Sequence, residues 1–564
     1  MLVLNQKIKD KITWPEGFRG IFFLAIILSI FFSYEMGVRP FADPDEGRYV
    51  EIPREMAATG DFVVPKLNGL KYFEKPALFY WLQAGVIKIF GISETSMRLW
   101  VVIFAILGCL GVFFVGSRFY SITVGLLSSG ILATNILYYA HSRLIILDLA
   151  VSILMSGTLW CFFMSFVNIP ARITSQKIHM TLAYALAALA CLTKGLIGIV
   201  LPGIIIFLWI VFTKNWSRIK DMLYIPGIFV FFAIFLPWHI MMALQDADFL
   251  HFYFVVEHLQ RYASNGHNRY QPPWFFIPIL LAGFLPWTGF SLVAIKNSCK
   301  KALAKDSENI FFICWIFGTL GFFSFSNSKL IPYILPLTPP IALITGIMLA
   351  ETFDTDDRNF KIGAWCNAFL FLIAYIAYTA AKEEISDILQ NPDAALLTNI
   401  FALLLIVAAL IPIYSSYCNF SKVRVTVACV FIGANMMWLI NKASVFYQEM
   451  KKPTTKELAK LISMNKKSGD LVFCYKRYYQ DFPVYLNSTV GVVDFVGELE
   501  FGAKADRNND KLIAEDDFWK LWSTTNKRIF LLLSQEHYRE AFATKNLTHT
   551  ILDFDKYFIV IMNK

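Results

Sequence analysis

The loop FADPDEGRYVEIPREMAATGDFVVPKLNGLKYFEKP, residues 41–76, decides how this chain is interpreted. It follows directly on an apolar segment, Ile21–Met36, and it is dense in acidic and basic side chains. Charged side chains are costly in hydrocarbon, so a stretch of this kind is expected at the surface of the bilayer. Because the rest of the chain is mostly apolar, this concentration of charged residues makes the loop the first candidate for a functional site.

The composition is that of a membrane protein. Of the 564 residues, 57% are hydrophobic and only 16% are charged, whereas soluble proteins carry about 25% charged residues. Apolar runs near the roughly 20 residues that cross a bilayer recur over the first 445 residues. We predict about 13 transmembrane helices, near residues 18–37, 97–115, 120–140, 144–168, 180–194, 196–213, 222–245, 274–296, 309–325, 331–350, 362–381, 397–416 and 423–443.

One short apolar run, Ala77–Phe90, is interrupted by Gln83 and Lys88. If it does not cross the membrane, the basic N-terminus and the basic short loops all face the cytoplasm, as the positive-inside rule requires. We therefore predict an interfacial amphipathic helix in the first outer loop. This topology puts Asp45 and the C-terminal region on the outer face.

The composition changes near Met450, and a small α/β domain is predicted beyond that point. We expect a transmembrane catalytic domain over residues 1–445 and an outer domain over 446–564. Runs rich in β-branched and aromatic residues predict strands, and longer polar segments predict helices. The strands are expected at Asp470–Tyr475, Val490–Phe495, Arg528–Leu533 and Tyr557–Met562, and the helices at Lys456–Leu461, Ala514–Trp522 and Gln535–Phe542.

Three other classes of protein are disfavoured. The net charge of +9 comes from basic residues in short loops between spans, so no nucleic-acid partner is predicted. The nine cysteines show no spacing typical of zinc sites or of a disulfide framework. No internal repeat is evident, which argues against a repeat-built transporter.

A few basic side chains lie on the outer side despite the positive-inside rule: Arg143, Lys194, Arg261, Arg269, Lys329 and Lys382. Each one could simply extend its charge to the headgroups. Because several occur on the side that holds the acidic loop, we favour an anion-binding cavity.

Two motifs in the loop suggest chemistry. The carboxylates of Asp43, Asp45 and Glu46 could bind a cation, act as a base or orient a substrate; alternatively Asp43 caps a helix while Asp45 acts in chemistry. The second motif runs from Lys71 to Pro76. The Lys75 amine is expected at the depth of a lipid phosphate, although the motif could also be an aromatic anchor.

Two further groups lie outside this loop. Arg143 and Asp148 flank the start of a span and could form a structural ion pair. Glu257, His258 and Arg261 could bind phosphate or a metal ion, although a lone histidine in a loop usually does neither.

The motifs PDEGRYVEIPREM, GLKYFEKP, RLIILD, TKG, EHLQRY and SKLIPYILP follow one another along the chain. Their order resembles that of the aminoarabinose transferases that modify lipid A. These enzymes are GT-C glycosyltransferases related to protein mannosyltransferases. The resemblance covers about residues 15–350, and it implies a GT-C fold of transmembrane and interfacial helices with a small C-terminal α/β periplasmic domain.

The resemblance also implies an activity and a location. The donor would be undecaprenyl phosphate carrying 4-amino-4-deoxy-L-arabinose, and the acceptor a phosphate of lipid A. The enzyme would be a monomer of the bacterial inner membrane, with its active site and C-terminal domain in the periplasm. The resemblance implies that no cofactor is required, although a divalent metal ion is possible.

Site residues carry over from the matching motifs. Asp45 matches an essential carboxylate, and Asp148 a second acidic residue in the cavity. Donor-phosphate binding is implied for Lys75 and Arg261, with Tyr72 and Tyr333 lining that pocket and Lys194 and Lys329 as further candidates. Glu74 matches a possible metal position, and Glu46, Arg48, Arg143 and His258 are other cavity candidates.

Two alternatives remain. A protein O-mannosyltransferase would share the carboxylates of the first loop, but it would need a groove for an extended peptide. A lipid or sugar transporter would place its ionisable residues near the middle of the membrane.

Overall fold

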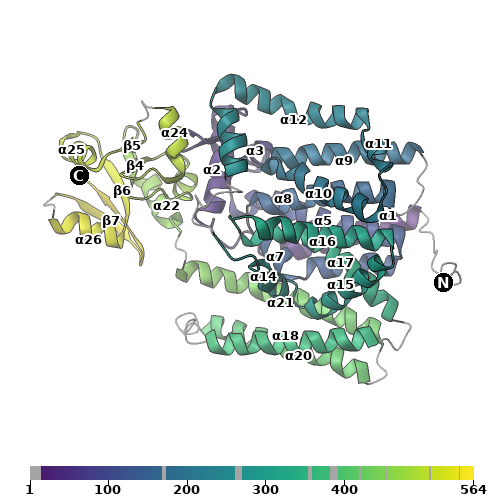
Figure 1. The fold of residues 1–564 in the computed structure, drawn as a ribbon. Helices are drawn as coiled ribbons and strands as arrows, with labels where there is room; N and C mark the ends of the chain where they lie inside the picture. Colours follow the sequence, from purple (N-terminus) through teal and green to yellow (C-terminus); the bar gives the residue numbers. More distant parts are fainter. Residues whose placement is uncertain are drawn as a thin grey trace. The chain divides into compact units, whose positions relative to one another are not determined.

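The computed structural model describes residues 14–167, 173–260, 270–353, 358–381, 392–417, 421–451, 454–506, 510–544 and 547–563. The chain forms two compact units (Figure 1). The first comprises Met1–Met36, Leu99–Ile240 and Phe254–Phe446. The second comprises Gly37–Arg98, Met241–Tyr253 and Tyr447–Lys564.

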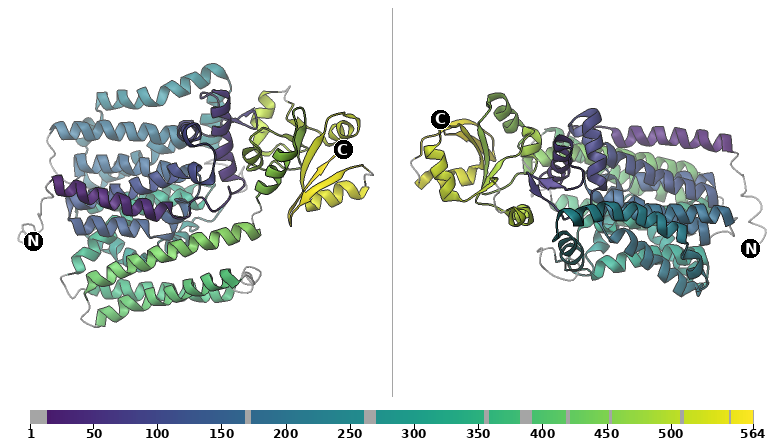
Figure 2. Two further views of the ribbon diagram at one scale, coloured as in Figure 1. Left: turned by 180° about the vertical axis from the view of Figure 1, so that it is seen from behind. Right: turned by 90° about the horizontal axis from the view of Figure 1, so that it is seen from above.

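The first unit is built from helices, and in both views of Figure 2 its long helices run side by side. The helices of this unit are α1 (Trp14–Ser33), α5 (Leu99–Phe119), α6 (Ile122–Ala133), α7 (Ile136–His141), α8 (Leu147–Phe162) with η1 (Phe163–Val167), α9 (Ile173–Lys194), α10 (Ile197–Thr213), α11 (Arg218–Met222), α14 (Phe276–Gly283), α15 (Thr288–Leu303), α16 (Ser307–Phe325), η3 (Ile331–Leu337), α17 (Thr338–Thr352), α18 (Arg358–Ala381) and α20 (Pro392–Tyr417). Three further helices belong partly to each unit: α12 (Ile225–Gln245), η2 (His251–Gln260) and α21 (Lys422–Lys451).

Eight helices among the described residues are long and apolar enough to cross a membrane, and the bent pair α14–α15 would make a ninth. The prediction of a polytopic helical membrane protein is therefore confirmed. Most predicted spans coincide with a helix, but the run 120–140 divides into α6 and α7, and the run 274–296 divides into α14 and α15, which are bent by 116°. In addition, α6, α10 and the described part of α1 are short. The count of 13 spans stays a prediction.

Small residues allow the helices of this unit to approach one another closely. A Cβ atom added to Gly116 of α5 would lie 2.9 Å from the Cα of Gly125 in α6. A Cβ atom on Gly198 of α10 would lie 2.5 Å from the backbone of Ala190 in α9. Contacts of this kind favour association in lipid, where the hydrophobic effect does not drive helices together.

The second unit joins the first loop to the C-terminal region. The loop forms α2 (Asp45–Thr59), a small hairpin of β1 (Lys66–Leu67) and β2 (Leu70–Lys71), α3 (Leu78–Phe90) and α4 (Glu94–Met97). The C-terminal region forms α22 (Lys456–Asn465), β3 (Leu471–Tyr475), α23 (Phe482–Leu486), β4 (Gly491–Val493), η4 (Gly497–Leu499), α24 (Glu500–Ala505), β5 (Leu512–Ile513), α25 (Glu515–Thr524), β6 (Ile529–Ser534), α26 (Gln535–Thr544), β7 (Thr550–Phe554) and β8 (Phe558–Met562).

The six C-terminal strands form one sheet in the order β5-β4-β3-β6-β8-β7 (Figure 1). β5, β4, β3 and β6 are parallel to one another, while β8 runs antiparallel to both of its neighbours, β6 and β7. The aromatic side chains Phe518, Trp519 and Trp522 of α25 are buried against β3 and β6. All four predicted strands and all three predicted helices of this region are confirmed, and β5 and β7 are additional.

α3 coincides with the run predicted to be an interfacial helix. Its 13 residues extend about 20 Å, well short of the roughly 30 Å of a bilayer core. Phe79, Tyr80 and Ala84 are buried, and Tyr49 of α2 stacks on Tyr80 with ring centroids 6.2 Å apart. The helix is confirmed, and its position along the membrane surface stays a prediction.

The first loop is attached to the C-terminal region by specific contacts. The Asn68 side chain donates to the Val490 carbonyl at 2.8 Å and accepts from the Val490 N–H at 2.9 Å. Phe41 stacks on Tyr485 with centroids 5.4 Å apart, and its N–H donates to the Tyr485 hydroxyl. The loop that contains Asp45 therefore has a fixed support about 400 residues away in the chain, as the sequence separations of 422 and 444 show.

Gly47 lets α2 meet the backbone before α23. A Cβ atom at Gly47 would lie 2.5 Å from both the Gln480 carbonyl carbon and the Asp481 nitrogen. We expect Gly47→Ala to destabilise this unit by about 1–3 kcal/mol, because backbone atoms cannot rotate away. Gly85→Ala in α3 is the matched control, since nothing lies within 4 Å of its Cβ position. Thermal unfolding of both variants tests this, and equal melting temperatures would contradict it.

Candidate functional site

Asp45 is the first residue of α2, and its side chain is 59% exposed. Its carboxylate accepts a hydrogen bond from the Arg48 guanidinium, one helical turn later. Arg48 is itself buried and also pairs with Glu498 at 2.6 Å. Asp45 is thus held on one side and open to solvent on the other, as a group that contacts a substrate must be.

The carboxylates of Asp43 and Glu46 are bound by other groups of the protein. The capping interpretation of Asp43 is wrong: α2 has no side-chain cap, and Asp43 accepts instead from the Gln480 N–H at 2.7 Å. Glu46 is fully buried, and its carboxylate accepts from Arg98 at 2.8 and 3.0 Å and from Arg39 at 3.0 Å. Burial opposes the ionisation of Glu46, but the two guanidinium groups outweigh it and lower its pKa.

The second motif of the loop adjoins the Asp45 group. The Lys75 amine donates to the Glu74 carbonyl at 2.8 Å and lies 3.9 Å from the Glu74 carboxylate. Tyr72 is buried, and burial raises its pKa well above the ordinary value, with the charge of Glu74 adding to the effect. The positive charge of Arg48 in α2 has the opposite effect and lowers the pKa of Tyr72.

Glu498, in η4, is a site residue that the sequence interpretation missed. Burial raises its pKa, Arg48 opposes that rise, and the charges of Glu74 and Asp45 contribute to it. The only signal in the sequence was an acidic residue in the C-terminal region, and nothing there indicated a partner 450 positions earlier.

Asp148, Lys194 and Tyr333 come together in the first unit. Asp148, in the first turn of α8, forms an ion pair with Lys194 at the end of α9. The Lys194 amine lies 4.7 Å above the Tyr333 ring. The Asp148 and Lys194 side chains are 15% and 18% exposed, so this group is nearly enclosed.

Arg143 does not pair with Asp148, so that structural alternative is wrong. Its guanidinium donates to the carbonyls of Phe32 and Tyr34, and to the Asn441 side chain at 3.2 Å. Arg143 therefore fixes the segment after α1 against α21.

Lys329 is also held by the backbone. Its amine donates to the carbonyls of Ser326 at 2.6 Å and of Gln271 at 2.8 Å. His258 lies in η2, but its side chain lies outside the described residues, as does all of Arg261. Among the described residues, no group of three or more His, Cys, Asp or Glu side chains could hold a metal ion, and Glu74 belongs to none.

A buried charge group lies further along α2. Arg54 pairs with Glu51 through two hydrogen bonds of 2.6 Å, and Glu55 accepts from the Gly69 N–H at 3.0 Å. Burial, and then the neighbouring Glu51, raise the pKa of Glu55 to about 8. This shift favours the protonated form of the Glu55 carboxyl group.

This predicts a pH dependence of stability. Glu55 ionises near pH 4.3 when unfolded, so between that pH and about 8 the folded state binds the extra proton. Stability should fall as pH rises through this window, by on the order of 1 kcal/mol per pH unit. Glu55→Gln should flatten this dependence of the melting temperature, whereas Glu457→Gln, at an exposed position of α22, should not. A wild-type melting temperature that is constant from pH 5 to 8 would contradict the assignment.

Comparisons with known proteins identify the family. Residues 18–253 match the model for dolichyl-phosphate-mannose-protein mannosyltransferase, and residues 458–563 match the model for the aminoarabinose transferase C-terminal domain. The undecaprenyl phosphate-alpha-4-amino-4-deoxy-L-arabinose arabinosyl transferase of Photorhabdus laumondii is 30% identical over 381 residues, which are 66% of this chain and 67% of that protein. The chain belongs to the aminoarabinose transferase family. A relative of the same name from Erwinia tasmaniensis is 29% identical over 66% of this chain and 70% of its own length.

Solved structures agree with this membership at the level of the fold. ArnT from Cupriavidus metallidurans, in a crystal structure bound to undecaprenyl phosphate, has a TM-score of 0.83 at 24% identity, covering 98% of this chain and 99% of that one. The archaeal oligosaccharyltransferase AglB from Archaeoglobus fulgidus has a TM-score of 0.53 at 12% identity, covering 93% of this chain and 70% of that one. The predicted GT-C architecture is confirmed, and this member of the aminoarabinose transferase family is a glycosyltransferase.

Proposed function

We propose that the protein moves 4-amino-4-deoxy-L-arabinose, or a similar aminosugar, from undecaprenyl phosphate to a phosphate of lipid A. The observation that carries the proposal is membership of a family whose relatives in Photorhabdus laumondii and Erwinia tasmaniensis bear that donor and sugar in their names. The bound undecaprenyl phosphate of the Cupriavidus protein supports a lipid-linked donor.

The location belongs to the same proposal. The enzyme is a monomer of the bacterial inner membrane with 13 spans, a transmembrane catalytic domain over residues 1–445 and a periplasmic domain over 446–564. The distribution of basic residues among the short loops supports this orientation, with Asp45 on the periplasmic face.

The reaction needs little proton transfer. The attacking group is a phosphate oxygen of the acceptor, which is already anionic near neutral pH because a phosphate monoester has a second pKa of about 6. A new bond forms from this oxygen to the anomeric carbon, and the bond from that carbon to undecaprenyl phosphate breaks. Attack opposite the leaving group inverts the anomeric centre. Asp45 therefore orients the acceptor and stabilises positive charge growing on the sugar, instead of acting as a base.

The leaving group is a polyprenyl phosphate, and cations stabilise its charge. We assign this role to Lys75 and Arg261, with Lys194, Tyr72 and Tyr333 as further candidates for binding the donor phosphate. Asp148 holds the Lys194 amine in place through their ion pair. Lys329, already bound to two carbonyls, adds positive charge from a fixed position. No step requires a metal ion.

The alternative functions require a different attacking group or a different acceptor. Protein O-mannosylation involves attack by a neutral hydroxyl, so Asp45 would need to accept a proton, and a peptide would replace the lipid acceptor. Mass spectrometry of lipid A from cells with and without this gene separates the cases. Loss of one amino-pentose on deletion supports the proposal, loss of one hexosamine changes the sugar, and an unchanged lipid A favours the alternatives.

A further inference from the structure

The second unit contains a segment from the middle of the chain, Met241–Tyr253, in addition to the first loop and the C-terminal region. We call it the middle segment. In the sequence it leads to Arg261, one of the two cations assigned to the donor phosphate, and the first loop carries the other, Lys75. Contacts between the middle segment and the first loop therefore bear on how the donor phosphate is bound.

An ion pair joins these two segments. The Lys71 amine lies 2.7 Å from an oxygen of the Asp246 carboxylate, and the two side chains are 34% and 11% exposed. Asp246 directly follows the last residue of α12, where the negative end of the helix dipole disfavours a carboxylate. Its other oxygen accepts from the Asp248 N–H at 3.0 Å, which is a local turn contact. The pair with Lys71, 175 positions earlier, is what offsets the unfavourable place of this charge.

Four phenylalanines pack together in the same region. Phe73 of the first loop contacts Phe249 of the middle segment and Phe501 of α24, with ring centroids 5.5 and 4.9 Å apart. Phe252 of the middle segment also contacts Phe501, at 4.2 Å. Phe73 and Phe249 are buried. The Phe501 ring, supplied by the C-terminal region, therefore contacts both segments at once.

Gly502 fixes the position of Phe501. A Cβ atom added to Gly502 would lie 2.7 Å from the Lys71 carbonyl oxygen and 2.7 Å from the Leu70 Cβ atom. The carbonyl belongs to the backbone of β2, so it could not rotate away from a larger residue. α24 therefore packs directly on the first loop, and the Phe501 ring is placed by contact between backbones.

We propose that Asp246 and Phe501 are positioning residues for the binding of the donor phosphate. Asp246 ties the middle segment to the first loop through Lys71, and Phe501 packs against Phe73 of one segment and Phe252 of the other. Neither side chain needs to touch the donor. The C-terminal region thereby takes part in sugar transfer through its contact with both segments.

The positions of the two cations in the sequence give the contact its effect. Lys75 follows Phe73 by two residues, and Arg261 follows Phe252 by nine. The contact with Phe501 thus restrains the start of each stretch of chain that leads to a cation. The inference rests on the proposed function, because it requires Lys75 and Arg261 to bind the donor phosphate.

The first test removes the aromatic contact. The probe is undecaprenyl phosphate, and its affinity for the purified full-length protein in detergent is measured by microscale thermophoresis. Phe501→Ala should weaken binding about 10-fold, because a small displacement of binding groups has large effects. Phe501→Leu keeps most of the apolar volume and should retain more affinity. In transfer assays the KM for the donor should rise, and the KM for lipid A should not.

Phe542→Ala is the matched control for this variant. Phe542 packs on Trp519 with ring centroids 5.7 Å apart, against the core of the C-terminal sheet. Its loss should lower the melting temperature and leave the affinity for undecaprenyl phosphate unchanged. The control therefore separates a positioning role from a general loss of stability.

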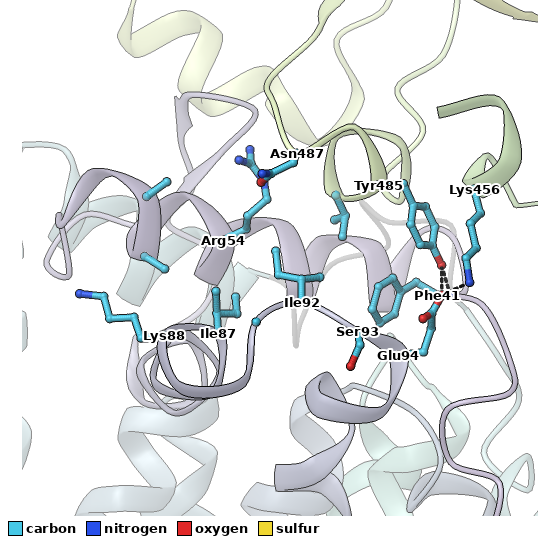
Figure 3. Close-up of a pocket in the computed structure, with 14 residues that line it drawn as sticks. Phe41, Arg54, Ile87, Lys88, Ile92, Ser93, Glu94, Lys456, Tyr485 and Asn487 are labelled. Atoms are coloured by element: carbon cyan, nitrogen blue, oxygen red, sulfur yellow. Dashed lines mark hydrogen bonds and ion pairs between the residues drawn. The ribbon is translucent and has the colours of Figure 1, made fainter. Parts of the chain in front are cut away.

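The second test reverses the ion pair. Asp246→Lys places two amines together and should weaken binding about 10-fold, and the double variant Lys71→Asp, Asp246→Lys should restore the affinity to within about threefold of the wild type. Glu94→Gln is the matched control. Glu94 also pairs with a lysine, Lys456, at 2.7 Å (Figure 3), and its side chain is 14% exposed. It should bind undecaprenyl phosphate as the wild type does.

Wild-type affinity in both Phe501→Ala and Asp246→Lys would overturn the inference and leave the proposed function standing. An equal loss of affinity in Phe542→Ala would also overturn it, since affinity would then follow overall stability. A double variant that binds no better than Asp246→Lys would show that the ion pair does not position the segments. A wild-type protein that does not bind undecaprenyl phosphate would instead refute the proposed donor, and the inference with it.

Discussion

Asp45→Asn is expected to lower the rate of sugar transfer at least about 100-fold while the protein stays folded. Removing one preorganised electrostatic group from an active site typically costs about 10²–10³ in rate. The carboxylate of Asp45 faces solvent with 59% of its side chain exposed, and an asparagine of the same shape fills its place. Arg48 retains its ion pair with Glu498, so no buried charge is left unpaired.

The measurement is single-turnover transfer from undecaprenyl phosphate-linked aminoarabinose to lipid A by purified protein, followed by mass spectrometry. Asp517→Asn is the matched control, because Asp517 also lies in the first turn of a helix of this unit and is 67% exposed. It should transfer sugar at the wild-type rate. If Asp45→Asn transferred sugar within about threefold of the wild type, Asp45 would have no electrostatic role in the reaction.

Local patterns in the sequence were enough to predict most elements. Long apolar runs located the helices of the first unit, and short runs of apolar, largely β-branched or aromatic residues located β3, β4, β6 and β8. β5 has only two residues, and the strand residues of β7 are mostly exposed, so neither gives a clear pattern. The bilayer and the buried sheet impose strong periodic constraints, whereas short edge strands do not.

The partners of the candidate residues could not be predicted in this way. Asp43 looked like a helix cap because a cap is a local interaction, but its donors come from residues 477 and 480. Asp148 looked like a partner of the nearby Arg143, yet it pairs with Lys194, 46 positions later. Charge density therefore located the candidate site, while pairing within it depends on tertiary contacts that no spacing in the sequence encodes.

Glu46 shows that the sequence also does not distinguish a structural carboxylate from a functional one. It belongs to the acidic cluster that first drew attention to the loop, but Arg98, 52 positions later, encloses its carboxylate. An acidic residue in a conspicuous cluster can therefore be structural. Exposure separates the two cases: Asp45 is accessible, whereas Glu46 is not.

Lys75→Met is expected to lower transfer about 100-fold, because an amine that neutralises a departing phosphate acts mainly in the transition state. Lys75→Arg keeps the positive charge and should retain more activity than Lys75→Met. The side chain of Lys75 is 13% exposed, so methionine can occupy its apolar stem region without a large change in packing. The rate and the donor KM should be measured together over a range of salt concentrations.

Lys66→Met is the matched control, since Lys66 lies in the same loop, is 34% exposed and pairs with Asp61 at 3.4 Å. It should leave both the rate and the donor KM unchanged. A lower rate in Lys75→Met with an unchanged KM would place the amine on the leaving phosphate, and a raised KM would place it on the bound donor as well. A variant with wild-type rate, donor KM and salt dependence would show that Lys75 does not contact the phosphate at all, and that its bond to the Glu74 carbonyl is purely structural.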